Sequence, residues 1–184
     1  MRLFAAVPVT EPARHQILSL LAKLRETGWP VRWVHDEGLH MTLKFFGEVA
    51  PERLDVIAEA LRFAANGADA LTLELGDLGA FPSRNRPRVL WVGVQAPAGL
   101  EVLQDRMERG CEAIGFPPEG APFQPHITLG RVREGQRLPT TGLEDHAEVF
   151  ERVSFVARQL VLYESMLTTT GPRYESRLTI DFGQ

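Results

Sequence analysis

The sequence predicts an α+β protein made of two similar halves that face each other across a cleft. Three segments carry apolar residues at helical spacing, and several shorter segments show the runs or alternation typical of strands. A strand–helix–strand order near the N-terminus recurs in the middle of the chain. Because 184 residues can bury one sizeable core and no long linker separates the halves, we expect residues 1–184 to form a single bilobal domain.

Two helices are expected in the first half. The first carries Ile17 and Leu21 on its apolar face and ends at Gly28 and Pro30, and Pro51 opens the second. The elements predicted here are strands at 3–9, 32–35, 39–46 and 71–75, and helices at 11–27 and 51–63.

The second half follows a predicted loop at 76–87, where glycine, proline and arginine gather. A helix is expected at 98–114, which Gly115 and Pro117 end. Residues 133–146 are polar and turn-rich, and 168–172 is a predicted turn. The strands predicted in this half lie at 89–94, 122–130, 150–155, 157–164 and 177–182.

The repeat between the halves is most specific at two His-x-Thr-Leu segments. The first starts at His40 and the second at His126, and each lies in a β-prone stretch after a strand and a helix. A pseudo-twofold relation between the halves would place the two segments opposite each other. A shift of 86 residues places His40 on His126, Thr42 on Thr128, Ala5 on Trp91 and Ile17 on Leu103.

These two segments carry the chemistry that the sequence predicts. Residues i and i+2 of a strand point to the same face, so each segment aims one imidazole and one hydroxyl in the same direction. One histidine can accept a proton while the other donates one, and threonine hydroxyls can stabilise a phosphate oxygen. A lone His-x-Thr is weak evidence, but two copies at matching places predict a site for phosphodiester hydrolysis.

Composition excludes several other classes of protein. A net charge of −4 and a pI of about 5.8 argue against a general nucleic-acid coat protein, so any RNA contact must be local. The single cysteine, Cys111, rules out an internal disulfide framework. The N-terminus lacks the pattern of a signal peptide, and no apolar run has the roughly 20 residues of a membrane helix. We therefore expect a cytoplasmic protein with no membrane contact, and a monomer.

No cofactor or metal is expected. The remaining histidines, His15, His35 and His146, have no cysteine, histidine or carboxylate at the spacing of a structural zinc site. Two imidazoles supply the proton transfers that hydrolysis needs, so the predicted chemistry requires no metal.

Three motifs resemble those of the 2H phosphoesterase superfamily, and more closely its bacterial and archaeal RNA 2′,3′-cyclic phosphodiesterases, once described as 2′-5′ RNA ligases. They are R-L-F-A-A-V-P from residue 2, H-M-T-L-K-F-F-G-E from His40, and P-H-I-T-L-G-R ending at Arg131. The resemblance spans nearly the whole chain. It implies a two-lobed fold with antiparallel-rich sheets lining a central cleft and helices outside. It also implies metal-independent conversion of an RNA 2′,3′-cyclic phosphate end to a 2′-phosphomonoester.

The resemblance also implies a role for each motif residue. His40 would donate a proton to the departing 3′ oxygen, His126 would activate water, and Thr42 and Thr128 would hold the phosphate. The pseudo-symmetry makes the two histidines chemically alike, so the assignment of acid and base stays open.

Five further residues are candidates for substrate binding. Strict strand alternation puts Lys44 on the face of His40, but puts Arg131 on the face opposite His126. Arg131 contacts phosphate only if the strand twists or ends near Gly130; otherwise it is a solvated charge. The remaining candidates are Phe45 in the first motif, Trp91 and Arg88. Trp91 either offers a base-stacking face beside Phe81 or belongs to the core, and Arg88 either meets RNA phosphates with Arg84 and Arg86 or is a solvated charge of the loop.

Two alternatives to hydrolysis remain. Microscopic reversibility allows the same site to join RNA ends through a 2′-5′ linkage. A module that binds nucleotides or RNA ends without turnover is the other alternative, although a pure binder does not need two proton-transfer groups.

Overall fold

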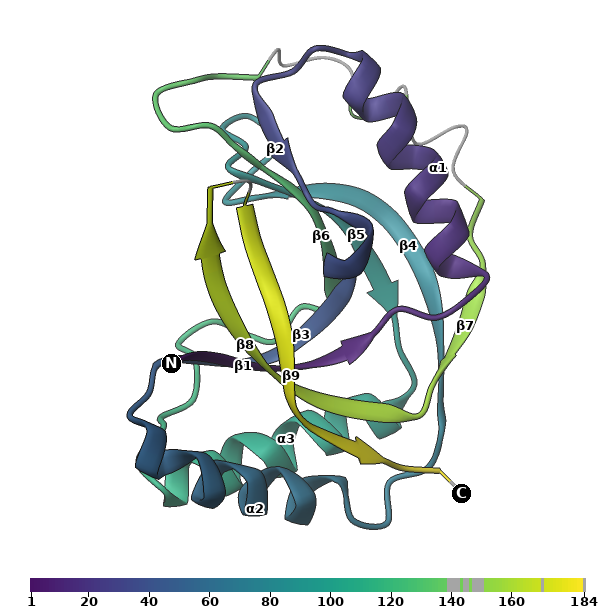
Figure 1. Cartoon of the computed structure of the whole chain (residues 1–184). Coiled ribbons are helices and arrows are strands. Elements are labelled where there is room, and N and C mark those ends of the chain that lie inside the picture. The colour runs from purple at the N-terminus through teal and green to yellow at the C-terminus, as the bar shows by residue number, and fades with distance from the viewer. Residues whose placement is uncertain (139–142, 144–145, 147–150, 170, 184) are drawn as a thin grey trace.

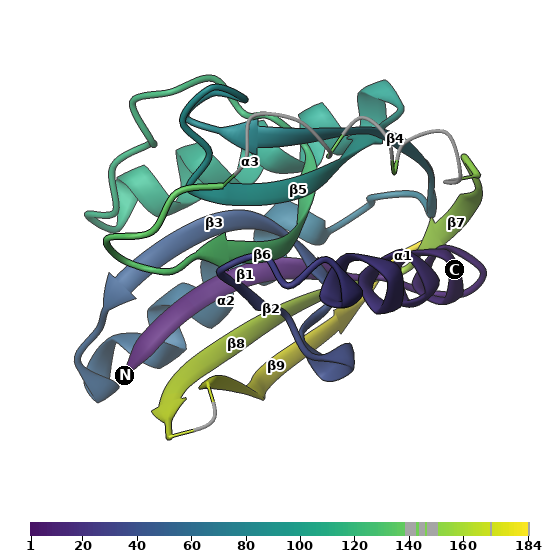
Figure 2. The same ribbon diagram turned by 90° about the horizontal axis from the view of Figure 1, so that it is seen from above.

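The computed structural model describes residues 1–138, 143, 146, 151–169 and 171–183. Within them, nine strands form one curled sheet with helices packed around it (Figures 1 and 2). The strands are β1 Arg2–Pro8, β2 Val31–Trp33, β3 His40–Glu48, β4 Leu71–Phe81, β5 Val89–Gln95, β6 His126–Val132, β7 Ser154–Ala157, β8 Gln159–Thr168 and β9 Gly171–Asp181. The helices are α1 Ala13–Glu26, α2 Leu54–Ala65 and α3 Ala98–Ala113, with 3₁₀ turns η1 Asp36–Gly38 and η2 Pro51–Arg53.

The order of the strands confirms the predicted α+β fold with two pseudo-symmetric halves. The order is β7-β4-β5-β6-β3-β1-β8-β9, and β2 also pairs with β6. Four strands lie on each side of the junction where β3 pairs with β6, with β8 and β9 returning to the side of β1 and β3. The two strands are antiparallel at that junction, and Met41 pairs with Ile127.

The core follows from the apolar patterns of the sequence. Residues 3–7 of β1 are all buried, as expected for a central strand covered on both faces. Figures 1 and 2 show α2 and α3 side by side at one end of the sheet, with α1 at the other. No helix in the described part of the chain is long and apolar enough to cross a membrane.

Both His-x-Thr strands contain a bulge at the same place. On β1 and β3, Ala6 pairs with Thr42 but Ala5 pairs with Lys44, so Leu43 is passed over. A bulge adds one residue to one strand of a pair and reverses the alternation of side chains beyond it. Residues after Leu43 therefore change face.

β6 contains the same bulge in the second His-x-Thr segment. Trp91 pairs with Thr128 and Leu90 with Gly130, so Leu129 is passed over in the same way. The match also corrects the predicted alignment by one residue, because Ala6, and not Ala5, occupies the register position of Trp91.

The bulge makes the prediction for Lys44 wrong. Lys44 was expected beside His40, but it turns to the buried face and is 1% exposed. Its Nζ donates to Glu108 Oε2 at 2.5 Å and to the carbonyl of Pro117 at 2.7 Å. Lys44 therefore holds α3 and the segment after it against the sheet, and it is not available to a substrate.

β4 continues through residues 76–81, which were predicted as loop. Position 79 of this strand is a glycine because the indole of Trp91 lies over it. A Cβ at Gly79 would lie 2.2 Å from the Trp91 ring. The glycine therefore meets a packing requirement and does not signal a turn. β8 and β9 are also longer than predicted and pair up to Thr168 and Gly171. Part of the strand predicted at 150–155, including Phe150, lies outside the described residues.

The burial of Lys44 leads to a stability prediction. Replacing Lys44 with alanine removes the cationic partner of Glu108, which is 14% exposed and keeps only the hydrogen bond from Gln104. Removing one partner of a buried pair costs roughly 3–5 kcal/mol, and we expect about 3 kcal/mol here because Glu108 keeps some water. Urea unfolding measures this loss. The control is Arg109→Ala, which removes an exposed ion pair of α3 and should cost less than about 1 kcal/mol. Equal costs would contradict the structural role of Lys44.

The packing of Gly79 leads to a second prediction. Gly79→Ala should destabilise the protein by roughly 1–3 kcal/mol, because the new methyl group overlaps the Trp91 ring. Urea unfolding followed by tryptophan fluorescence measures both the loss and the displaced indole. The control is Gly93→Ala, whose Cβ would find its nearest neighbours at an ordinary 3.4 Å. A Gly79→Ala protein as stable as this control would refute the packing argument.

Candidate active site

The two His-x-Thr segments meet at the centre of the sheet. Met41 and Ile127 are paired and fully buried, so the residues that flank them point to the other face. The antiparallel register sets His40 across from Thr128 and Thr42 across from His126. All four side chains are half-buried on this shared face. The fold thus brings the four predicted catalytic residues into one cluster with a local twofold arrangement.

The imidazole of His126 is held by its own strand. Its Nδ1 lies 2.7 Å from the carbonyl of Gln124, so Nδ1 carries the proton in that bond and Nε2 remains for chemistry. Phe81 meets the ring edge to face at 5.0 Å, and Trp91 lies 6.1 Å away. Burial lowers the pKa of His126, and the charge of Arg131 lowers it further, while the bond to Gln124 and the charge of Glu119 oppose the shift.

His40 has an equivalent but deeper setting. It also bonds to the backbone two residues earlier, at Gly38. Its ring lies 4.7 Å from Phe4, 5.1 Å from Tyr174 and 6.0 Å from Tyr163. Burial lowers its pKa from 6.5 to about 4, with smaller contributions from the charges of His126 and Arg131, while the bond to Gly38 opposes the shift. The charge of His126 contributes to the lowered pKa of His40, in keeping with the β3–β6 register that puts both imidazoles on one face.

The aromatic wall around His40 comes from strands far apart in the sequence. Phe4 belongs to β1, Tyr163 to β8 and Tyr174 to β9, and no spacing rule links them. Burial raises the pKa of both tyrosines, so their hydroxyls stay protonated as hydrogen-bond donors. No local sequence pattern ties either tyrosine to His40, and the contact becomes visible only in the fold.

Arg131 lies on the face of the histidines. The bulge at Leu129 makes Arg131 pair with Val89, two residues from Trp91, so Arg131 and Thr128 share a face. Its charge acts on His40, His126 and Tyr174. Of the two alternatives left open by the sequence, a change of parity before Arg131 is therefore the one observed.

The other candidate binding residues differ in position. Phe45 follows the first bulge as Arg131 follows the second; it is 51% exposed and its ring lies 5.9 Å from Phe4. Trp91 is half-buried beside His126, and its Nε1 is buried without a partner in the described structure. Arg88 is exposed just before β5, and its carbonyl accepts a hydrogen bond from the amide of Val132.

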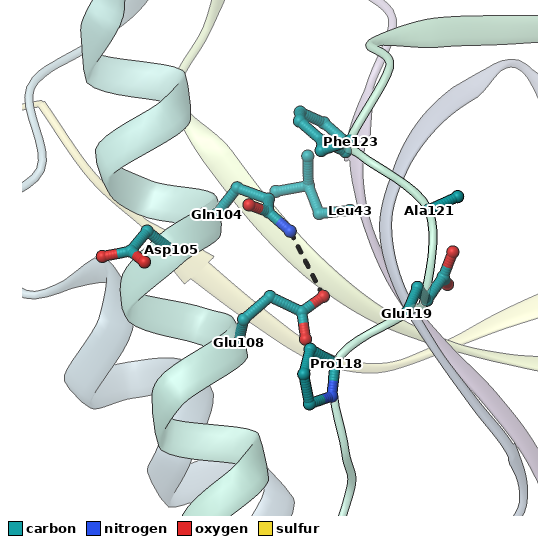
Figure 3. Close-up of a pocket in the computed structure, with 8 residues that line it drawn as sticks. All are labelled: Leu43, Gln104, Asp105, Glu108, Pro118, Glu119, Ala121 and Phe123. Carbon is teal, nitrogen blue, oxygen red and sulfur yellow. Dashed lines mark hydrogen bonds between the residues drawn. The ribbon is translucent and has the colours of Figure 1, made fainter.

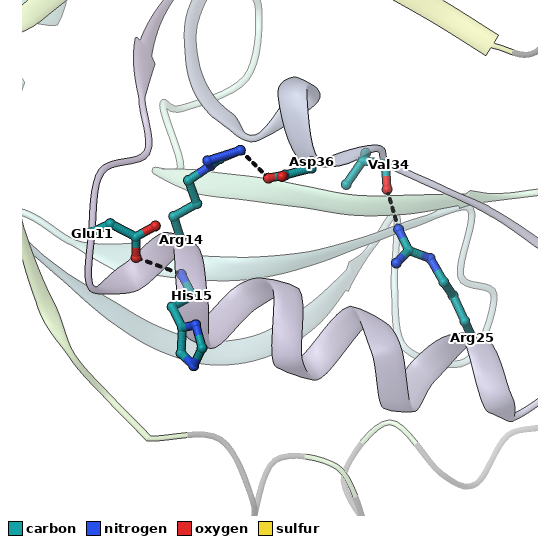
Figure 4. Close-up of polar contacts among 6 residues, drawn as sticks. All are labelled: Glu11, Arg14, His15, Arg25, Val34 and Asp36. Atoms are coloured by element: carbon teal, nitrogen blue, oxygen red, sulfur yellow. Dashed lines mark hydrogen bonds and ion pairs between the residues drawn. The ribbon is translucent and has the colours of Figure 1, made fainter.

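Two arginines of α1 hold the segment that leads into His40 (Figure 4). Arg14 pairs with Asp36, and Arg25 donates to the carbonyl of Val34 at 2.8 Å. His15 on the same helix is exposed and takes no part in the cluster. These contacts hold η1 in place, and with it Gly38, whose backbone forms a hydrogen bond with His40.

A separate pocket of about 270 Å³ lies between α3 and residues 118–123 (Figure 3). None of the four predicted catalytic residues lines it. Within the described residues, no group of three or more histidine, cysteine, aspartate or glutamate side chains is arranged to hold a metal ion.

Comparisons with known proteins place this geometry in a family. Residues 7–91 and 92–174 each match the model described as LigT like phosphoesterase. An Aeropyrum pernix protein named RNA 2′,3′-cyclic phosphodiesterase is 40% identical over 163 residues, covering 85% of this chain and 91% of its own.

Two solved structures share the fold over the whole chain. A Thermus thermophilus protein matches with a TM-score of 0.80 and 27% identity, covering 100% of this chain and 98% of its own. Escherichia coli LigT complexed with 3′-AMP matches with a TM-score of 0.76 and 29% identity, with the same coverage. Because the family model matches both halves, each with its own His-x-Thr segment, the chain belongs to the LigT-like phosphoesterase family.

Proposed function

We propose that the protein hydrolyses RNA 2′,3′-cyclic phosphate ends to 2′-phosphomonoesters, with His40 and His126 as acid and base and without a metal. One observation carries the proposal: the β3–β6 pair sets two imidazoles and two threonine hydroxyls on one face. The name of the Aeropyrum pernix relative and the 3′-AMP bound to Escherichia coli LigT support the substrate class.

The reaction needs two proton transfers. His126 takes a proton from water through Nε2, and the water oxygen forms a bond to phosphorus. The bond between phosphorus and the 3′ oxygen breaks, and His40 gives its proton to that oxygen. Thr42 and Thr128 donate hydrogen bonds to the non-bridging oxygens, where negative charge builds up. The product carries a 2′-phosphate and a 3′-hydroxyl, and solvent exchange restores both histidines.

The pKa shifts bear on which histidine is the acid. In the free protein His40, with a pKa of about 4, is mostly neutral at pH 7, which suits a base better than an acid. An anionic phosphate beside an imidazole favours its charged form and raises its pKa. The roles implied by the family resemblance therefore require the bound phosphate to raise the pKa of His40 more than that of His126.

Replacing either histidine tests the mechanism. We expect His40→Ala and His126→Ala each to lower kcat on a nucleoside 2′,3′-cyclic phosphate by roughly 10²–10⁴-fold, because each removes one proton transfer. The control is His35→Ala, which removes an exposed histidine outside the pair and should keep near-normal turnover. Assays contain EDTA, and activity should survive it. A histidine variant with normal kcat, or loss of wild-type activity in EDTA, would refute the mechanism.

The pH dependence of kcat/KM provides an independent test. This quantity reports the free enzyme, in which burial lowers the pKa of both histidines. We therefore expect a bell-shaped profile with an acid limb near pH 4 and a basic limb below pH 6.5, whichever histidine is the acid. The profile of kcat should lie at higher pH, because the bound phosphate favours imidazolium. An optimum of kcat/KM above pH 7 would contradict the lowered pKa values of the two histidines.

A further inference from the structure

We infer that Arg32 and Arg131 form a second phosphate subsite, which holds a phosphodiester on the 5′ side of the terminal nucleotide. The inference rests on the proposed function and names what the site would recognise beyond the cyclic phosphate. It makes Arg32 a specificity residue that favours RNA over a mononucleotide. Arg32 played no part in the chemistry predicted from the sequence.

The register of β2 and β6 places the two arginines together. Arg32 pairs directly with Arg131, and paired residues of an antiparallel ladder point to the same side with Cα atoms about 4.5–5.5 Å apart. The neighbours of Arg32 in β2 turn the other way: Val31 is buried and Trp33 packs against Trp29. Arg32 therefore extends the histidine face outward from Arg131, and Figure 2 shows β2 beside β6.

The charges of this pair are not balanced locally. Both side chains are exposed, and no carboxylate of the described residues forms an ion pair with either guanidinium. Like charges directly opposite on a sheet are destabilising. The chain as a whole has more acidic than basic residues, 24 against 20, so the excess positive charge at these two arginines is a local feature. An anion that bridges the two guanidinium groups would remove the repulsion.

A backbone phosphodiester is the anion that the proposed substrate would bring to this position. Planar guanidinium groups bind phosphate oxygens through paired hydrogen bonds. Arg131 already acts on the charges of both histidines, so it borders the reacting phosphate, and Arg32 lies one strand further away. A cyclic phosphate occupies the 3′ end of RNA, so every other phosphate lies on the 5′ side. The phosphate that reaches Arg32 is therefore a backbone phosphodiester.

The test compares two substrates that differ only in the additional phosphates and nucleosides. These are adenosine 2′,3′-cyclic phosphate and the adenosine trinucleotide with the same cyclic end. We expect Arg32→Ala to lower kcat/KM for the trinucleotide about tenfold more than for the mononucleotide, through KM. The slope of log kcat/KM against log salt for the trinucleotide should also become shallower by about 0.7, as for one lost phosphate contact on a single strand.

The matched control is Arg62→Ala. Arg62 is exposed on α2, at the end of the molecule away from β2 in Figure 1, and its removal changes the net charge equally. It should leave both substrates unaffected. Equal losses on both substrates in Arg32→Ala, or an unchanged preference and salt slope, would overturn the subsite.

The failure of the proposed function is separable from the failure of the subsite. If the wild-type protein turns over neither substrate, the proposed function fails. Binding of a fluorescent trinucleotide with a terminal phosphate then decides the subsite alone. Weaker binding in Arg32→Ala but not in Arg62→Ala supports it, and equal binding in all three proteins refutes it.

Discussion

The pairing of β3 with β6 is the constraint on which the site depends. Met41 and Ile127 lie at the local twofold axis and are fully buried, so the sheet cannot slip by one residue without exposing both. That register alone decides that each histidine lies opposite the threonine of the other half. Neither half of the chain holds a complete site, and the core that joins the halves also assembles the chemistry.

Burial then sets the properties of the two imidazoles. Aromatic rings surround both histidines, and the loss of water lowers the pKa of each. Two buried imidazoles beside an arginine charge favour the binding of an anion. The negative charge of the anion offsets the free-energy cost of burying a charged imidazole. The same surroundings that stabilise the fold therefore prepare the site for a phosphate ester.

The sequence was sufficient for residues whose position follows from local period, and insufficient where one extra residue changes that period. His40 and Thr42 share a face because they are two apart, and this could be predicted. Nothing in the composition marks the bulge at Leu43, so strict alternation gave the wrong face for Lys44 and an unresolved one for Arg131. Tyr174 joins His40 only through the β8–β9 pairing, a contact that no local pattern encodes.

The bulges also break the symmetry that hides the roles of the histidines. Up to Leu43 and Leu129 the two motifs are nearly equivalent, but the next residue to face the site is Phe45 in one and Arg131 in the other. Both histidines have aromatic neighbours, but the residue after the second bulge adds a positive charge that the residue after the first does not. In the proposed subsite the arginine side would hold the RNA backbone, which would give the cyclic phosphate one orientation and turn its 3′ oxygen toward one imidazole. The direction of proton transfer would then depend on the residues after the bulges as well as on the pKa values of the two histidines.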